Sequence, residues 1–214
     1  MGISENGMFG ASKGKVGKLV YYKRKGKNIV RTIGRNTKEP SPAQLRSRME
    51  LSVASVFSKV VKPFITYGFA QHIVGKDLSQ SNVSTGYVMK SALIGEYPDI
   101  SIDYEKVVLS EGPLLSADQA AVTIVPEGLE FSWYVAEQIP WPDNTDQVMV
   151  LAYFPGTEHI LYNLFGPERT AGKALLKISE PLLGKYFETY IAFISADRSQ
   201  VSDSVYTGGF NKPA

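Results

Sequence analysis

The feature that most constrains the fold is a series of short apolar segments at regular spacing over the last hundred residues. Segment 129–135 alternates, with large apolar side chains at every second position: Leu129, Phe131, Trp133 and Val135. A period of two indicates a β-strand with one buried face. Seven segments of this kind, separated by turn residues, predict an antiparallel β-sandwich. We expect its strands at 120–125, 129–135, 147–154, 159–163, 173–178, 186–195 and 200–207.

A different pattern precedes the sandwich. Ser41 suits a helix N-cap, Pro42 suits the first helical position, and Gln44 completes a capping box. Apolar residues then recur at helical spacing as far as Pro63, which we expect to end or kink this helix. A second, shorter helix is predicted within 79–94 and a strand within 101–109.

Residues 16–33 predict a β-hairpin. Two segments rich in β-branched and aromatic residues flank the sequence Lys23-Arg24-Lys25-Gly26-Lys27, where the glycine suits a tight turn. The first dozen residues are rich in glycine and are expected to form a flexible arm. The predicted fold class is therefore α+β, with a basic N-terminal region at 1–114 and the sandwich at 115–214.

Charge is distributed unevenly along the 214 residues. Residues 1–72 hold 14 Lys and Arg against 3 Asp and Glu, whereas residues 73–214 hold 9 against 18. The densest basic cluster coincides with the predicted hairpin: Lys13, Lys15, Lys18, Lys23, Arg24, Lys25, Lys27, Arg31 and Arg35. A basic N-terminal third and an acidic remainder of the chain indicate two surfaces with different partners.

Several functional classes have little support. The chain has no cysteine, and its two histidines, His72 and His159, are not at metal-ligand spacing from other ligands. No phosphate-binding loop is present, so we expect no catalytic site, metal or cofactor. No apolar run is long enough to cross a membrane, and we expect no secretory signal, although a processed chain would look the same. The lack of cysteine fits a reducing cytoplasm or a virion built there.

The C-terminal half resembles a fibronectin type III or immunoglobulin-like domain, so the resemblance implies an immunoglobulin-like antiparallel β-sandwich. The resemblance rests on Trp133 in the second strand, the aromatic-rich segment from Tyr186 to Phe193, and the closing segment Ser202-Asp203-Ser204-Val205-Tyr206. Such domains mostly bind or space other molecules, which is what this resemblance implies here.

The whole chain also resembles an uncharacterised bacterial family, known mainly from Bacteroidota and described only as a domain of unknown function. Segments that carry this resemblance include Gly26-Lys27-Asn28-Ile29-Val30-Arg31, Pro42-Ala43-Gln44-Leu45-Arg46 and Tyr97-Pro98-Asp99-Ile100. This resemblance brings no established activity with it. In addition, Ser41-Pro42-Ala43-Gln44 with Arg48 is similar to a short motif of phage-type structural proteins, although starting a helix explains most of this motif.

Three functional hypotheses follow. The first is a non-enzymatic structural subunit, phage-like or filamentous, whose basic N-terminal region docks on the acidic sandwich of another copy or of another structural protein. The second is a nucleic-acid-binding protein that uses the basic hairpin with Tyr21 and Tyr22. The third is a sandwich that binds carbohydrate or peptide at Trp141, in the loop Pro140-Trp141-Pro142.

Overall fold

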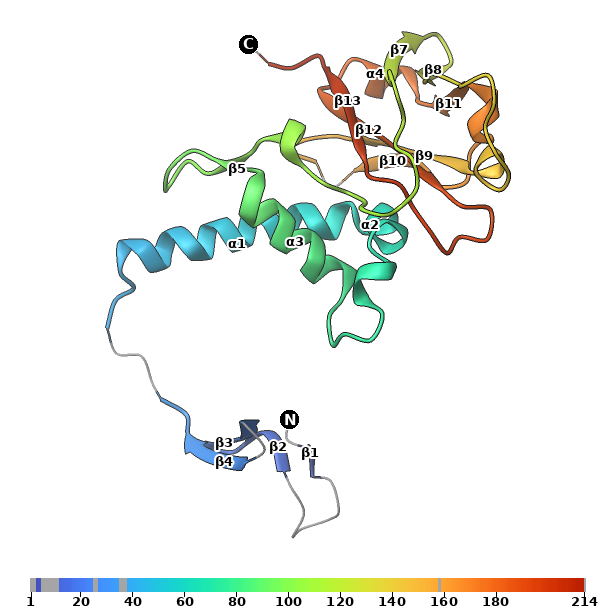
Figure 1. Ribbon diagram of the computed structural model, residues 1–214. Helices are drawn as coiled ribbons and strands as arrows, with labels where there is room; N and C mark the ends of the chain where they lie inside the picture. The colour runs from blue at the N-terminus through green and yellow to red at the C-terminus, as the bar shows by residue number, and fades with distance from the viewer. Residues whose placement is uncertain (1–2, 5–11, 25–26, 35–37, 158, 214) are drawn as a thin grey trace. The chain divides into compact units, whose positions relative to one another are not determined.

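The computed structural model describes residues 3–4, 12–24, 27–34, 38–157 and 159–213. It divides into two compact units, Met1–Ser41 and Pro42–Ala214, which we call the hairpin unit and the main body (Figure 1). The fold is α+β, as predicted, with antiparallel sheets in both units.

The hairpin unit is a small antiparallel sheet. Its strands follow chain order and are β1 (Ile3–Ser4), β2 (Ser12–Val16), β3 (Leu19–Arg24) and β4 (Lys27–Thr32). The predicted hairpin is present, but β2 extends it to a third long strand. Ile3 and Ser4 pair with β2, so this part of the expected flexible arm is a strand instead. The remainder of the arm lies outside the described residues.

Three helices follow in the main body: α1 (Pro42–Val60), α2 (Lys62–Gly68) and α3 (Gln80–Ser91). The start of α1 at Pro42 and the presence of α3 confirm the sequence predictions. Pro63, however, stands in the first turn of α2, where proline loses no helical hydrogen bond. The predicted strand at 101–109 is wrong over most of its length. Only Ser101–Ile102 (β6) pairs, with Leu93–Ile94 (β5), and the 3₁₀ turn η3 (Tyr104–Lys106) follows.

Seven strands form two facing sheets, which is a β-sandwich. One sheet has the order β10 (Ile160–Asn163), β9 (Gln147–Tyr153), β12 (Phe187–Ile194), β13 (Val205–Phe210). The other has the order β11 (Lys173–Lys177), β8 (Gly128–Ser132), β7 (Ala121–Val125). The short helix α4 (Glu180–Leu183) and the 3₁₀ turns η2 (Gln71–Ile73), η4 (Asp143–Thr145) and η5 (Arg169–Ala171) lie in the connections.

Strands β9 and β12 are buried on both faces, because the four-stranded sheet lies between the helices and the three-stranded sheet (Figure 1). Met149, Leu151 and Tyr153 share a core with α1, α2 and α3. Their neighbours Val148 and Val150 share a second core with Leu129, Phe131 and Trp133. The helices therefore belong with the sandwich, and the division after Ser41 differs from the boundary expected at 114/115.

Candidate interaction site on the hairpin unit

The strand register sorts the hairpin unit into two unlike faces. Residues directly opposite each other share a face, and positions two apart along a strand do so as well. Lys15 and Arg31 are both opposite Val20, and Arg24 is opposite Lys27. With Lys13, two positions before Lys15, these five cations make what we call the basic face: Lys13, Lys15, Arg24, Lys27 and Arg31.

The opposite side of the sheet carries apolar residues. Tyr21 is opposite both Gly14 and Val30, and Leu19 is opposite both Val16 and Thr32. We call the group Val16, Leu19, Tyr21 and Val30 the apolar face. Val16 and Val30 are each 51% exposed, so this face is open to solvent within the unit.

The hairpin unit has no core of its own among its described residues. Every position in 12–24, 27–34 and 38–41 is exposed or only partly buried. A small sheet gains independent stability when a hydrophobic face is covered. This amphipathic sheet, with both faces accessible, is therefore a candidate interaction surface, because a partner that covers one face would stabilise it.

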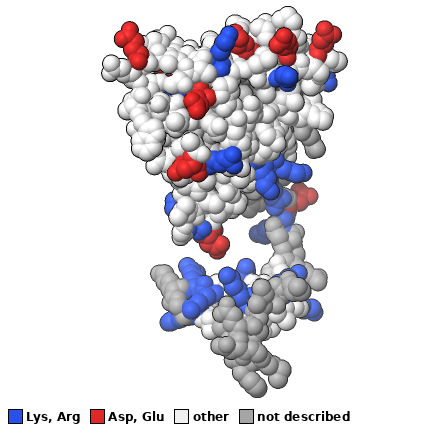
Figure 2. All heavy atoms as spheres, turned by 90° about the vertical axis from the view of Figure 1, so that its right-hand side faces the viewer, with Lys and Arg blue, Asp and Glu red and all other residues white. Residues whose placement is uncertain are grey.

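Tyr22 lies among the cations of the basic face. The Arg31 guanidinium carbon is 6.0 Å from the centre of the Tyr22 ring, at the outer limit of a cation–π contact. Residues 12–34 contain no Asp or Glu, so no carboxylate of this segment neutralises the face. Figure 2 shows the blue Lys and Arg side chains on this unit.

The nine cations predicted as a site are thus only partly brought together. Five lie on the basic face, Lys23 lies on the other side opposite Asn28, and Lys18 follows Gly17 in the turn between β2 and β3. Gly17 has φ +58°, which favours glycine in this turn. Lys25 and Arg35 lie outside the described residues.

The remaining predicted residues are the two helix-cap positions and Trp141. Ser41 is the last residue of the hairpin unit and stands immediately before α1, and Gln44 stands in the first turn of that helix. Trp141 is 80% exposed, in the loop that leads into η4. His72 and His159 lie on η2 and before β10, and within the described part of the chain no three His, Cys, Asp or Glu side chains are placed to hold a metal ion.

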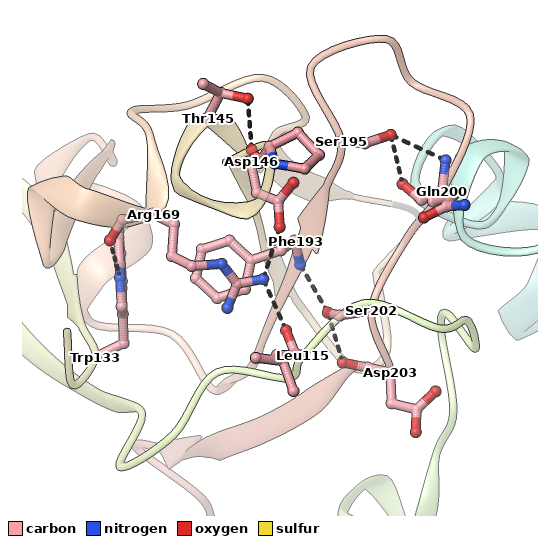
Figure 3. A network of polar contacts seen from close by, with 11 residues as sticks. Leu115, Trp133, Thr145, Asp146, Arg169, Phe193, Ser195, Gln200, Ser202 and Asp203 are labelled. Carbon is pink, nitrogen blue, oxygen red and sulfur yellow. Dashed lines mark hydrogen bonds and ion pairs between the residues drawn. The ribbon is translucent and has the colours of Figure 1, made fainter. Parts of the chain in front are cut away.

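A buried ion pair in the sandwich was not predicted from the sequence. Arg169 Nη2 donates to Asp146 Oδ2 at 2.9 Å and to the Leu115 carbonyl at 2.8 Å (Figure 3). The guanidinium lies 3.8 Å from the centre of the Phe193 ring, and Trp133 Nε1 donates to the Arg169 carbonyl at 2.7 Å. Burial raises the pKa of the Asp146 carboxyl, and the hydrogen bond from Arg169 acts in the opposite direction. These contacts join the loop segments around Arg169 to β12.

Within the residues that the structure describes, no helix combines the length and apolar character that crossing a bilayer requires. No curated protein and no solved structure matches the chain, so the resemblance to fibronectin type III domains remains an interpretation. A family model does match residues 11–208, which is nearly the full length. The chain therefore belongs to that family, described as a family of unknown function (DUF6266).

Proposed function

We propose that this protein is a non-enzymatic structural subunit that self-associates through its hairpin unit. The observation that carries the proposal is the apolar face of a sheet that has no buried residue among its described positions. Burying apolar surface contributes about 25 cal/mol per Å², so covering this face favours a folded and associated unit.

The uneven charge of the chain supports the same proposal. The hairpin unit is basic, whereas residues 73–214 carry twice as many acidic as basic residues. A contact between unlike surfaces of two copies is heterologous and builds rings or filaments. The similarity of Ser41-Pro42-Ala43-Gln44 to phage-type structural proteins points to an assembly of that kind.

The test is sedimentation of the full chain with the apolar face altered. Leu19→Ser with Val30→Ser is expected to shift the protein from associated species to monomer. Ile124→Ser is the matched control, because Ile124 is similarly exposed, at 47%, on strand β7 of the sandwich. Equal association of the double variant and the wild type would contradict the proposal.

A second candidate function is nucleic-acid binding through the basic face. The specific observation is that five cations and Tyr22 share one side of a sheet in a segment without carboxylates. Each phosphate contact adds about −0.9 to the slope of log affinity against log salt on duplex DNA.

The basic face allows a sharp test of this candidate. The variant Lys15→Ala, Arg24→Ala, Lys27→Ala, Arg31→Ala is expected to lose retardation of DNA or RNA. The control Lys18→Ala with Lys23→Ala removes cations off that face and is expected to retain most binding. Absence of any retardation by the wild type at about 50 mM salt, where such contacts are strong, would exclude the candidate.

A further inference from the structure

A cavity opens in the main body beside Trp141. Its volume is about 700 Å³, within the usual range for pockets that bind ligands. Four segments line it: Leu114, the loop 141–147, Glu168, and the turn at 195–200. Figure 3 shows four of these lining residues: Thr145, Asp146, Ser195 and Gln200. We call this cavity the Trp141 pocket.

The lining of the Trp141 pocket is acidic. It contains Asp143, Asp146, Glu168 and Asp197 and includes neither Lys nor Arg. Asp146 is paired with Arg169 beneath the surface, which leaves three carboxylates outside that ion pair. Hydrogen bonds from Ser195 and Ser199 lower the pKa of Asp197 to about 2, so this carboxylate is charged at neutral pH.

Trp141 adds an aromatic surface to these charges. Its side chain lines the pocket and is 80% exposed. An indole face attracts Lys and Arg side chains, and tryptophan is among the residues that contribute most to protein interfaces. Carboxylates beside an open indole together suit a cationic protein segment.

We infer that the Trp141 pocket receives the end of the β3–β4 hairpin from a second copy of this chain. Arg24 and Lys27 face each other at the last register position that the structure gives for these two strands. Their side chains therefore leave the sheet together at its end, where they reach into a pocket more easily than cations in the middle of a strand. This inference rests on the proposed self-association and names its receptor.

Charge complementarity selects this occupant. Segment 12–34 contains cations and no carboxylate, whereas the lining of the Trp141 pocket contains carboxylates and no cation. A basic hairpin and an acidic pocket on the same chain also give each copy one donor surface and one receptor surface. Such a contact repeats from copy to copy.

A charge-swap experiment with two full-length variants tests the inference. The first variant carries Arg24→Glu with Lys27→Glu, and the second carries Asp143→Lys with Glu168→Lys. Each alone is expected to raise the dissociation constant for self-association roughly tenfold or more, because like charges then meet. An equimolar mixture is expected to recover association, since each hairpin then finds a pocket of opposite charge.

Matched controls separate the pocket from general charge effects. Glu127→Lys with Glu137→Lys makes the same charge change at exposed positions outside the lining and is expected to leave association unchanged. Trp141→Ala is expected to weaken association, whereas Tyr162→Ala, at a side chain that is 44% exposed on β10, is not. Unchanged thermal unfolding midpoints establish that the variants of the main body fold, and amide hydrogen exchange in β3 and β4 establishes this for the Arg24 and Lys27 variant.

The outcomes distinguish the two proposals. If the Asp143 and Glu168 variant associates like the wild type, or if the mixture stays monomeric, the Trp141 pocket is not the receptor. If the Leu19 and Val30 variant nevertheless loses association, self-association through the apolar face still holds and only the receptor is wrong. Wild-type protein that is monomeric at every concentration overturns both proposals.

Discussion

Arg24 lies directly opposite Lys27 across strands β3 and β4. Two cations at facing positions repel each other, and like charges at such positions destabilise a sheet. The same face carries Lys13, Lys15 and Arg31, and no acidic residue occurs between residues 12 and 34. This arrangement costs stability in an isolated unit and becomes favourable when a negatively charged partner covers the basic face.

The first prediction concerns this cross-strand pair. Lys27→Glu creates an opposite-charge pair with Arg24 and is expected to stabilise the hairpin unit by up to about 1 kcal/mol. Amide hydrogen exchange in β3 and β4 is expected to slow, while self-association weakens because the basic face loses charge. Faster exchange together with stronger association would contradict the interpretation of this face.

The second prediction concerns the buried ion pair. Arg169→Met leaves Asp146 buried without its cation, and the free energy of unfolding is expected to fall by about 3–5 kcal/mol. Adding Asp146→Leu removes the unpaired charge and is expected to restore much of this loss. Denaturant unfolding measures both variants. If the Arg169→Met variant is as stable as the wild type, Arg169 does not stabilise the sandwich.

The third prediction concerns the core shared by the helices and the sandwich. Phe57 of α1 is buried, and its ring centre lies 5.0 Å from that of Tyr153 on β9. Phe57→Ala is expected to lower the free energy of unfolding by about 3–5 kcal/mol. Circular dichroism and tryptophan fluorescence should report one common transition, because helices and sheet share this core.

The neighbouring residue supplies the control for Phe57. Val56 is 56% exposed, and Val56→Ala is expected to change stability by less than about 0.5 kcal/mol. Separate transitions of helices and sandwich in the Phe57 variant and the wild type would contradict a shared core.

The fourth prediction concerns acid pH. The pKa of Asp197 is lowered to about 2 by hydrogen bonds from Ser195 and from both the backbone and side chain of Ser199. The ionised group stabilises the turn at 195–200 above pH 3.8, its ordinary pKa, and this contribution is lost as pH falls toward 2. Carboxyl NMR titration measures the value directly. Asp197→Asn should remove this part of the pH dependence of unfolding, and a titration midpoint near 3.8 would contradict the prediction.

The sequence predicted element types better than element boundaries. Period-two alternation identified β8, and the signals at Ser41 and Pro42 identified the start of α1. Helix α2 was missed because Pro63 is equally compatible with the end of one helix and the beginning of the next. Strands β9 and β12 were expected at 147–154 and 186–195, but only the structure shows that helices cover one face of their sheet.

For the candidate sites, the sequence predicted which residues are present but not how they are arranged in space. The cluster of cations at 13–35 is evident in the sequence, but its separation into two faces depends on a strand register that a one-residue shift would reverse. Arg169 and Asp146 are 23 residues apart, and nothing in their spacing indicates a contact. Trp141 was identified as an exposed aromatic, whereas its acidic surroundings come from three segments that only folding brings together.

Sedimentation equilibrium of the wild-type protein over a range of concentrations, at low and high salt, tests the central claim most directly. Self-association through the hairpin unit predicts a mass that rises with concentration. Docking of Arg24 and Lys27 in the Trp141 pocket predicts in addition that the mass falls as salt screens the basic and acidic surfaces. A mass equal to that of one chain at every concentration and at low salt would contradict it.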